Sequence, residues 1–405
     1  MKNMHVPVPI SYLVPEFPGQ THAFFWRELS AIEQSGVPVH VFSTRRPQDA
    51  ACPHAFAAAA RARTSYLFPP GLTALRALIH PVRLARAMAY VAGLRETPLP
   101  RRAMLMALIG SATRLVAECR ARGIAHVHIH SCANAAHLGA LAHILGDIDY
   151  SLTLHGDLPV YGTDHAAKMA RARFVSAVTA PLQASLRQVI DAQGRFPVIW
   201  MGVDSDRFCP DPARRATRPA ERFEVVSAAR LNFTKGHRFF LRAMAQLRAE
   251  GLDIHYRLAG EGPERAAIEA EIAELNLGAH VEMLGSVGED QILELLQSSD
   301  ALALTSIQQG EAAPVAVMEA MACGLPAICS VIGGTPDMIE DGVDGFLVAQ
   351  EDVTAIADAT RALATDLARR KTMGGAARAT ALRLFDHRTN ALALYREIAG
   401  PEQAA

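Results

Sequence analysis

The fold of this 405-residue chain is decided by FEVVSAARLNFTKGHRFFLRAMAQLRAEGLDIHYRLAGEG, residues 223–262. Apolar runs at 223–231 and 254–262 predict two strands, and the helical period between Gly236 and Gly251 predicts an amphipathic helix. A strand, a helix and a second strand in succession are typical of a βαβ unit, in which the two strands pair in parallel.

The same alternation extends through both halves of the chain. Strands are predicted in the first half over 5–15, 38–44, 125–131, 150–156 and 174–180, and in the second over 281–287, 301–306, 326–331 and 345–349. Further helices are predicted over 24–36, 263–277, 290–300 and 313–324. Pro263 suits a helix first turn and Gly324 a helix end, which supports two of these boundaries.

This pattern predicts an α/β protein of two doubly wound, Rossmann-like domains facing a central cleft. The first domain is expected over residues 1–200 and the second over 201–385, joined near 196–208. The C-terminal helix, 386–405, is expected to pack back onto the first domain. Parallel sheets of this kind bind ligands at the carboxyl ends of their strands.

Composition excludes several classes of protein. Hydrophobic residues make up 50% of the chain, which excludes a disordered protein. The six cysteines are scattered without metal-ligand spacing and are expected to be reduced thiols of the core. The N-terminus does not resemble a signal peptide, and no apolar run is long enough to span a bilayer. We therefore expect a soluble, cytoplasmic protein.

Charge is distributed unevenly along the chain. Residues 1–200 contain 20 Lys and Arg against 11 Asp and Glu, whereas the remainder contains 20 against 30. Residues 61–122 alone contain eleven arginines and only two acids, Glu96 and Glu118. Two interpretations stay open: a surface helical pair whose Arg stems cover apolar surface, or a peripheral contact with anionic membrane. The segment lacks interleaved aromatics, so a nucleic-acid partner is not expected.

The segment GEAAPVAVMEAMACGLP, residues 310–326, contains the most informative pair of acids. Glu311 follows a predicted strand, and Glu319 lies eight positions later in the next helix. Pro314 suits the first turn of that helix, whose free N–H groups and dipole favour an anion. Glu319 could accept hydrogen bonds from a vicinal diol such as a ribose. Taken alone, both glutamates could be solvated surface charge.

Two cations precede this pair in the same domain. Arg230 lies at a predicted strand end and Lys235 five residues later, and two such cations suit a diphosphate. They could instead be ion-paired within the acidic domain. Gly260 and Gly262 follow the next strand and allow close approach of backbone to a ligand. A dinucleotide fingerprint is not completed here, so an NAD site is disfavoured.

The ordered motifs ARLxxxKG, LAGxGP, LxGxV, ExxPxxxMEAMAxGxP and GGxPxxIxDGxxGFLV strongly resemble the family-4 retaining glycosyltransferases of GT-B fold. The clear resemblance covers about residues 223–348, and SLTLHGDLPVYG and MGVDSDRFCP extend it weakly. The opening SYLVPEFPGQTHAFFWREL is similar to that of the exopolysaccharide branch. Three positions depart from the family pattern: Ala312 replaces a Gly, Asp337 a Glu and His22 a Glu.

The resemblance implies a role for each motif residue. Arg230 and Lys235 would hold the diphosphate of a nucleotide sugar, Glu319 would bind the ribose, and Glu311 would face the donor sugar. The resemblance also implies that backbone N–H groups near Ala312, Ala313 and Val315 complete the phosphate site. Gly260 and Gly262 would approach the donor, and Gly285 to Val287 would border the base. His155 would approach the sugar from the first domain.

These roles predict a retaining, metal-independent hexosyltransferase that uses a UDP-sugar in exopolysaccharide or cell-surface polysaccharide synthesis. The acceptor, a saccharide or a lipid-linked saccharide, would bind the first domain, and no cofactor is expected besides the donor substrate. Asp147 with Asp149 and Asp204 with Asp206 spell DxD, but neither pair falls in the predicted site. Two alternatives stay open: an epimerase or phosphorylase on the same fold, and a nucleotide-sugar sensor without turnover.

Overall fold

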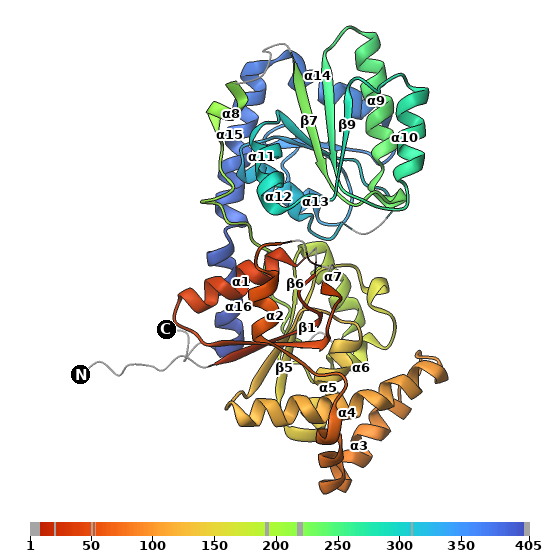
Figure 1. Ribbon diagram of the computed structural model, residues 1–405, viewed down its shortest axis with the longest axis vertical. Coiled ribbons are helices and arrows are strands. Elements are labelled where there is room, and N and C mark those ends of the chain that lie inside the picture. The colour runs from red at the N-terminus through yellow and green to blue at the C-terminus, as the bar shows by residue number, and fades with distance from the viewer. Residues whose placement is uncertain are drawn as a thin grey trace, which may run out of the picture. The chain divides into compact units, whose positions relative to one another are not determined.

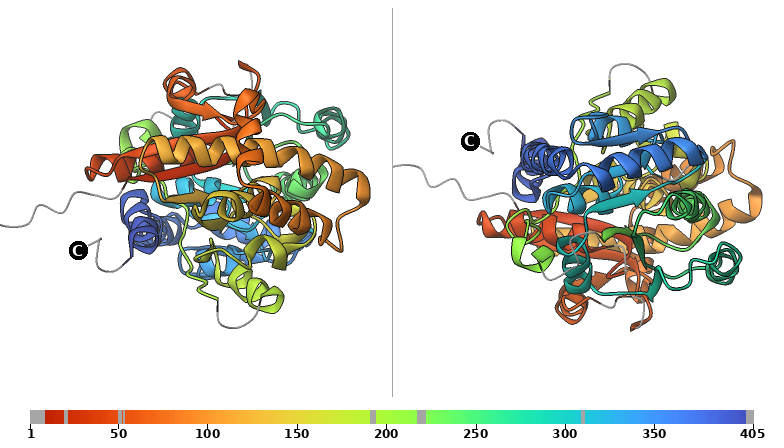
Figure 2. Two further views of the ribbon diagram at one scale, coloured as in Figure 1. Left: turned by 90° about the horizontal axis from the view of Figure 1, so that it is seen from below. Right: turned by 90° about the horizontal axis from the view of Figure 1, so that it is seen from above.

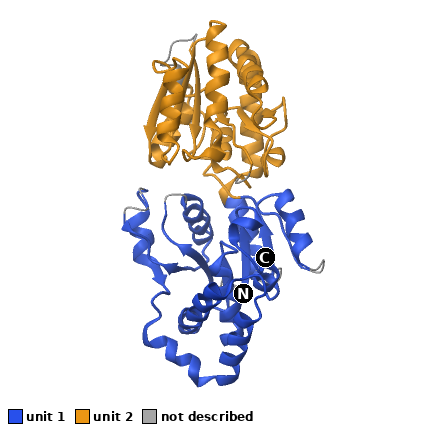
Figure 3. Ribbon diagram, turned by 90° about the vertical axis from the view of Figure 1, so that its right-hand side faces the viewer, with its two compact units in different colours: residues 1–200, 388–405 blue, residues 201–387 orange. Residues whose placement is uncertain are grey.

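The structure, a computed structural model, describes residues 9–19, 22–49, 52, 54–190, 194–216, 222–308 and 311–400. Residues 5–8 of the first predicted strand, Gly310, and residues 401–405 of the predicted C-terminal helix lie outside the described residues. The chain forms two compact units, residues 1–200 with 388–405 and residues 201–387 (Figure 3).

The first unit contains a six-stranded sheet in the order β3-β2-β1-β4-β5-β6, and every strand pair is parallel. Its strands are β1 Ile10–Glu16, β2 Val39–Arg45, β3 Thr64–Tyr66, β4 His126–Ile129, β5 Asp149–Leu154 and β6 Val175–Ala177. Its helices are α1 Ala23–Gln34, α2 Ala57–Arg63, α3 Pro81–Ala92, α4 Leu99–Ala121, α5 Asn134–Gly146, α6 His165–Met169, α7 Ala180–Val189 and α16 His387–Ala399, with 3₁₀ segments η2 Gly71–Ile79 and η3 Leu158–Tyr161.

The second unit contains another six-stranded parallel sheet, in the order β12-β11-β10-β7-β8-β9. Its strands are β7 Phe223–Ala228, β8 Ile254–Ala259, β9 Val281–Gly285, β10 Ala301–Leu304, β11 Ala327–Ser330 and β12 Gly345–Val348. Its helices are α8 Pro212–Ala216, α9 His237–Ala249, α10 Arg265–Glu274, α11 Glu289–Gln297, α12 Val315–Ala322, α13 Thr335–Met338, α14 Val353–Thr365 and α15 Leu367–Leu384, with the 3₁₀ segment η4 Phe233–Lys235.

Both sheets have the same topology. Numbered within its own unit, each has the order 3-2-1-4-5-6, and the direction of winding reverses between the first and fourth strands. The helices cover both faces of each sheet (Figures 1 and 2). The predicted α/β class with two doubly wound, Rossmann-like domains is confirmed. In such sheets the switch point, here between β1 and β4 and between β7 and β10, is where ligands bind.

Local sequence pattern explains the elements. In α9 the side chains of Phe240, Met244 and Leu247 are buried at helical spacing, while Arg242 on the opposite face is exposed. The strands alternate less because parallel sheets are buried on both faces. The edge strand β3 was not expected, since its three residues lie within the arginine-rich stretch and carry too little apolar pattern to be recognised.

Two predicted proline positions are wrong by one or two residues. Pro314 is the N-cap of α12 rather than part of its first turn, and Pro263 precedes Glu264, the N-cap of α10. Gly324 has a φ of +69° just beyond the end of α12, as expected of a helix C-terminus. The C-terminal helix α16 contributes Leu394, Tyr395 and Ile398 to the same apolar cluster as β1 and α1 of the first unit.

Candidate functional site

The switch point of the second unit brings together the loops that follow β7 and β10. Arg230 lies two residues beyond the end of β7 and its side chain is exposed. Its backbone carbonyl accepts a hydrogen bond from Asn232 N (3.0 Å) and lies 3.3 Å from His237 Nε2. Burial lowers the pKa of His237 to about 4, so the ring is neutral at pH 7. The backbone of Arg230 is thus held by hydrogen bonds while its cationic side chain is exposed.

The loop that contains Lys235 is hydrogen-bonded to the residues that follow β10. Ile307 N donates to Thr234 O (2.8 Å), and Thr305 Oγ1 donates to Gly236 O (3.0 Å). Gly236 has a φ of +63°, and a Cβ there would lie 2.0 Å from Thr305 O. Only glycine permits this approach, which places Lys235 beside the loop after β10.

Lys235 Nζ forms an ion pair with Glu311 Oε1, and the same oxygen accepts a hydrogen bond from Ser306 Oγ (2.7 Å). The side chain of Glu311 is 5% exposed and that of Lys235 is 16% exposed. A buried carboxylate is thus compensated by one cation and one hydroxyl. The ammonium has three donors, so contact with Glu311 leaves it able to bind a phosphate as well.

The segment after Glu311 leads directly into α12. Ala312 and Ala313 are buried, Val315 is the first helical residue, and Glu319 is 8% exposed in the second turn. Ala312 does not have a positive φ within the described part of this loop, where the left-handed residue is Gln308 at +67°. The position that is Gly in the related family therefore imposes no backbone strain here.

Gly260 and Gly262 pack closely against the loop that follows β7. A Cβ at Gly260 would lie 1.9 Å from Ala229 O, and one at Gly262 would lie 2.2 Å from Leu231 O. Their small size lets the loop after β8 pack against the loop of Arg230, where Glu264 N donates to Leu231 O (2.9 Å). These glycines therefore support the Arg230 loop, and their approach to the donor stays a prediction.

Gly333 is a further support that the motif interpretation did not assign. Its φ is +54°, and a Cβ there would lie 1.9 Å from Glu311 O. Gly334 N donates to the same carbonyl at 3.1 Å. The GG pair thus holds the backbone of Glu311 from the end of β11. Neither its positive φ nor its partner was predicted from the sequence.

Val287 stays a predicted neighbour of the base. It follows β9, at the edge of the sheet, and lines a cavity of about 280 Å³ together with Arg257, Leu284 and Gln291. In the strand order, β8 lies between β9, which precedes Val287, and β7, which precedes Lys235.

His155 directly follows β5 in the first unit, and its environment makes it neutral. Its Nε2 lies 3.1 Å from His130 Nδ1, and its backbone N–H donates to Tyr161 Oη (3.0 Å). Burial, with smaller contributions from His130 and His22, holds its pKa well below the usual value. Within the described residues its Nδ1 is buried without a hydrogen-bond partner.

A polar chain extends behind His155. His130 Nε2 lies 3.3 Å from Glu28 Oε1, and Tyr12 Oη donates to the same oxygen at 2.6 Å. Burial, followed by the charge of Glu28, raises the pKa of Tyr12 well above its usual value. Glu28 and His130 were not singled out from the sequence, because their partners come from α1, β1 and β4.

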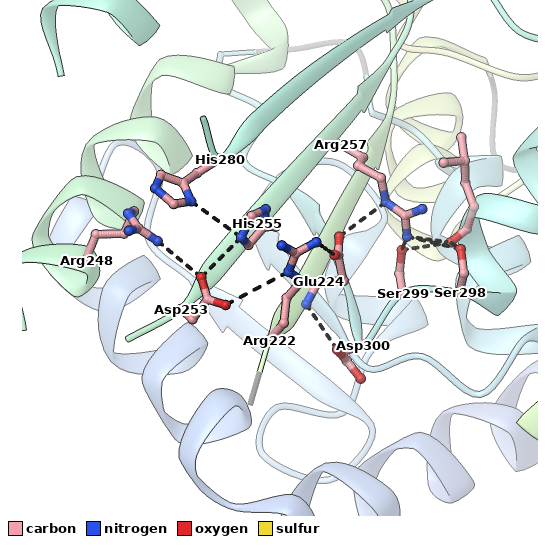
Figure 4. Close-up of polar contacts among 11 residues, drawn as sticks. Arg222, Glu224, Arg248, Asp253, His255, Arg257, His280, Ser298, Ser299 and Asp300 are labelled. Carbon is pink, nitrogen blue, oxygen red and sulfur yellow. Dashed lines mark hydrogen bonds and ion pairs between the residues drawn. The ribbon is translucent and has the colours of Figure 1, made fainter. Parts of the chain in front are cut away.

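Within the described residues, metal-ligand side chains form a group of three only at the amino ends of β8 and β9 (Figure 4). His255 Nε2 lies 3.1 Å from Asp253 Oδ1 and 3.4 Å from His280 Nδ1. The carboxylate of Asp253 already forms ion pairs with Arg248 at 3.4 Å and with Arg222 at 3.9 Å. Two guanidinium groups make this a poor place for a divalent cation, and the contacts are those of a surface ion-pair network.

The two DxD pairs have structural partners. Asp147 has a φ of +56° at the end of α5, and its carboxylate accepts from Arg83 at 2.6 Å. Asp204 Oδ1 accepts from the backbone of Asp206 and Arg207 at 3.2 and 3.3 Å, which closes a turn. Metal independence stays a prediction. Among the helices of the described residues, none combines the length and apolar character that crossing a bilayer requires.

Comparisons with known proteins agree with this arrangement. Residues 212–380 match the family described as glycosyl transferases group 1. A protein of Escherichia coli K12, assigned to colanic acid biosynthesis as the glycosyltransferase WcaL, is 34% identical over 167 residues, which are 40% of each chain. A GDP-mannose-dependent alpha-(1-6)-phosphatidylinositol monomannoside mannosyltransferase of Mycolicibacterium smegmatis is 31% identical over 50% of this chain and 56% of its own length. The match therefore spans only about half the length of these relatives or less.

Similarity of structure extends over nearly the whole chain. The crystal structure of Anabaena Alr3699/HepE in complex with UDP-glucose superposes with a TM-score of 0.71 and 19% identity, covering 95% of this chain and 98% of that one. This likeness confirms the GT-B class of fold, and the sequence matches confirm the resemblance to glycosyltransferases of the exopolysaccharide branch. Residues 212–380 of the chain thus match the family of group 1 glycosyl transferases, within a two-unit fold shared with solved GT-B glycosyltransferases.

Proposed function

We propose that the protein is a retaining glycosyltransferase that moves a hexosyl group from a nucleotide sugar to a hydroxyl of a glycan or lipid-linked saccharide. The observation that carries the proposal is the joining of Lys235, Ser306 and Glu311 at the switch point of the second sheet, beside exposed Arg230 and the start of α12. Two cations and a helix N-terminus suit a diphosphate. A buried carboxylate suits sugar hydroxyls.

Each residue has a defined part in this proposal. Arg230 and Lys235 bind the diphosphate and stabilise the charge that develops on the leaving group. Glu319 binds the ribose hydroxyls, and backbone N–H groups at the start of α12, near Ala312, Ala313 and Val315, bind phosphate oxygens. Glu311 orients the sugar. The first unit binds the acceptor, and neutral His155 offers its free Nδ1 to a sugar hydroxyl.

The chemistry balances without a cofactor. The bond between the anomeric carbon and the phosphate oxygen breaks, and the acceptor oxygen bonds to the same face of that carbon. The acceptor proton passes to the leaving phosphate oxygen, and a nucleoside diphosphate is released. Arg230 and Lys235 neutralise the diphosphate, so we propose that no metal ion is needed. No side chain at this site is proposed as a covalent nucleophile.

The donor is proposed to be a UDP-sugar, and the pathway exopolysaccharide or cell-surface polysaccharide synthesis. Supporting observations are that the solved Anabaena protein was crystallised with UDP-glucose and that the E. coli relative is assigned to colanic acid biosynthesis. The mycobacterial relative is GDP-mannose-dependent, so the nucleotide must be tested directly.

A thermal-shift panel of nucleoside diphosphates and nucleotide sugars, with and without EDTA, tests the proposal first. A ligand that binds only the folded state raises the melting temperature. We expect a shift with uridine nucleotides that survives EDTA, followed by glycosyl transfer to added acceptors. Epimerisation of the donor without acceptor, phosphate-dependent turnover, or binding without any turnover would each point to a different function.

A further inference from the structure

Large apolar side chains are exposed in one part of the first unit. Of the sixteen such side chains recorded among the described residues, nine lie within residues 68–104. They are Phe68, Leu72, Leu75, Leu78, Ile79, Val82, Met88, Leu99 and Met104. Their exposures range from 49% for Met88 and Met104 to 85% for Leu72. A concentration of this kind marks an interaction surface rather than scattered surface residues.

The geometry of η2 explains why the leucines lie together. A 3₁₀ helix has three residues per turn, so side chains three apart are stacked on one face. Leu72, Leu75 and Leu78 form one such outward row, while Ala77 on another row is buried. A Cβ at Gly110 of α4 would lie 3.2 Å from the Cβ of Ala74, so η2 packs on α4 through its small residues.

Uncompensated positive charge accompanies the apolar row. Arg76, Arg86, Arg95 and Arg101 are exposed, and none forms an ion pair within the described residues. Glu96 is the only acid between residues 68 and 104. Its Oε2 accepts a hydrogen bond from Asp164 N at 2.9 Å. The surface therefore combines apolar side chains with a net positive charge.

A cavity lies beside this row. It measures about 460 Å³ and lies between η2 and α4, with Arg76, His80 and Arg120 providing polar groups and Ile79, Val116 and Leu145 providing apolar ones. Such a cavity can accept a phosphate at its cationic groups and part of a hydrocarbon chain at its apolar wall. Figure 1 shows α3 projecting at one end of the first unit, beside α4.

We propose that residues 68–104 dock on an anionic membrane surface. The outward leucines enter the boundary between headgroups and acyl chains, and the arginines bind lipid phosphates. This inference goes beyond the proposed transfer reaction and does not depend on the donor site. A second copy of the chain is a poorer occupant, since a two-fold interface would place the same unpaired arginines against one another.

Vesicle flotation with the full chain tests this proposal. We expect binding to vesicles of phosphatidylcholine and phosphatidylglycerol at 0.1 M NaCl, much weaker binding to phosphatidylcholine alone, and loss of binding at 0.5 M NaCl. Replacing Arg76 and Arg86 by Ser should lower the partition coefficient about fivefold for each arginine. The triple variant L72S/L75S/L78S should lower it by at least about tenfold.

The matched control is L367S/L382S, which changes two exposed leucines of the second unit and should bind vesicles like the parent. Circular dichroism of each variant checks folding. In a second measurement, a Trp introduced by Leu75→Trp should be quenched by brominated lipid, whereas one introduced by Leu367→Trp should not. Equal binding to neutral and anionic vesicles, or no binding to either, overturns the proposal. The proposal is also overturned if the chain does not bind vesicles and instead forms a dimer that the substitutions L72S/L75S/L78S dissociate.

Discussion

Lys235 and Glu311 form an ion pair that joins the loop after β7 to the loop after β10, and Ser306 holds the same carboxylate oxygen. The two residues are 76 positions apart in the chain. The pair places a cation and an anion side by side at the switch point of the sheet, where a diphosphate and a sugar would meet.

Lys235→Met should lower kcat by about 10²- to 10³-fold, because the leaving diphosphate loses a cation. It should also destabilise the second unit, since buried Glu311 loses its counter-charge. Adding Glu311→Gln should recover part of the stability but none of the activity. Urea unfolding and initial rates of the single and double variants measure both effects. Lys371→Met, at an exposed position on α15, is the control, and wild-type kcat in Lys235→Met would remove Lys235 from the site.

Glu319→Ala should weaken nucleotide binding about 10- to 100-fold, the loss expected for hydrogen bonds from a ribose to a charged acceptor. Isothermal titration with the best nucleoside diphosphate measures this. The parent should bind the matching 2′-deoxynucleotide more weakly than the ribonucleotide. Glu319→Ala should bind these two nucleotides with nearly equal affinity. Glu274→Ala on the surface of α10 should bind like the parent. If removing the 2′-hydroxyl lowered affinity by the same factor in the parent and in Glu319→Ala, recognition of the ribose by Glu319 would be contradicted.

Gly236→Ala should disrupt donor binding more than Gly251→Ala, although both glycines have a positive φ. A Cβ at Gly236 would lie 2.0 Å from Thr305 O, whereas nothing lies within 4 Å of one at Gly251. Gly251→Ala should therefore cost only the backbone term, about 1 kcal/mol, and keep wild-type affinity. Nucleotide titration and thermal unfolding of both variants distinguish loss of the loop from general destabilisation.

Stability should fall as pH decreases from 7 to 5. Burial is the main cause that lowers the pKa of His22, His137 and His237 to about 4 and that of His126 to about 3. The unfolded chain binds protons near pH 6.5 and the folded chain does not, so stability is present above that pH and is lost below it. Each buried imidazole contributes on the order of 2 kcal/mol of loss at pH 5.

Urea unfolding of each variant at pH 7.5 and pH 5 tests this. His128→Gln removes one fully buried imidazole, whose pKa lies well below its usual value because of burial and the neighbouring His130, and should flatten the pH dependence. His80→Gln, at an exposed position, is the matched control. A stability that does not change between the two pH values would show that the buried histidines are protonated in the folded state.

Most of the fold was predictable from local pattern. Each apolar run of the second half became a strand within a few residues of its predicted bounds, because periodicity and helix-end residues act over short distances. Pro314 and Pro263 were misplaced because the exact helix start depends on the chain that precedes it. β3 was missed because three residues at a sheet edge have almost no pattern of their own.

The candidate site was predictable only in part. Arg230, Lys235, Glu311 and Glu319 were found from motifs, but Ser306, His237 and Gly333 were not assigned. Gly260 and Gly262 were predicted to approach the donor, and the structure adds that they pack on the carbonyls of Ala229 and Leu231. The sequence shows where the glycines are. It does not show which backbone atom each glycine approaches, because that atom lies in a loop after another strand.

The sequence alone determined the order of strands and helices, the two-domain organisation and the residue types available at each strand end. Those properties follow from patterns that repeat within one or two turns or strands. Only the tertiary structure decided that Lys235 meets Glu311, that Glu28 stands behind His130, and that the leucines of η2 face outward with unpaired arginines. The reason is physical: sheet order and burial bring together residues far apart in sequence, and neither quantity is encoded in any single local segment.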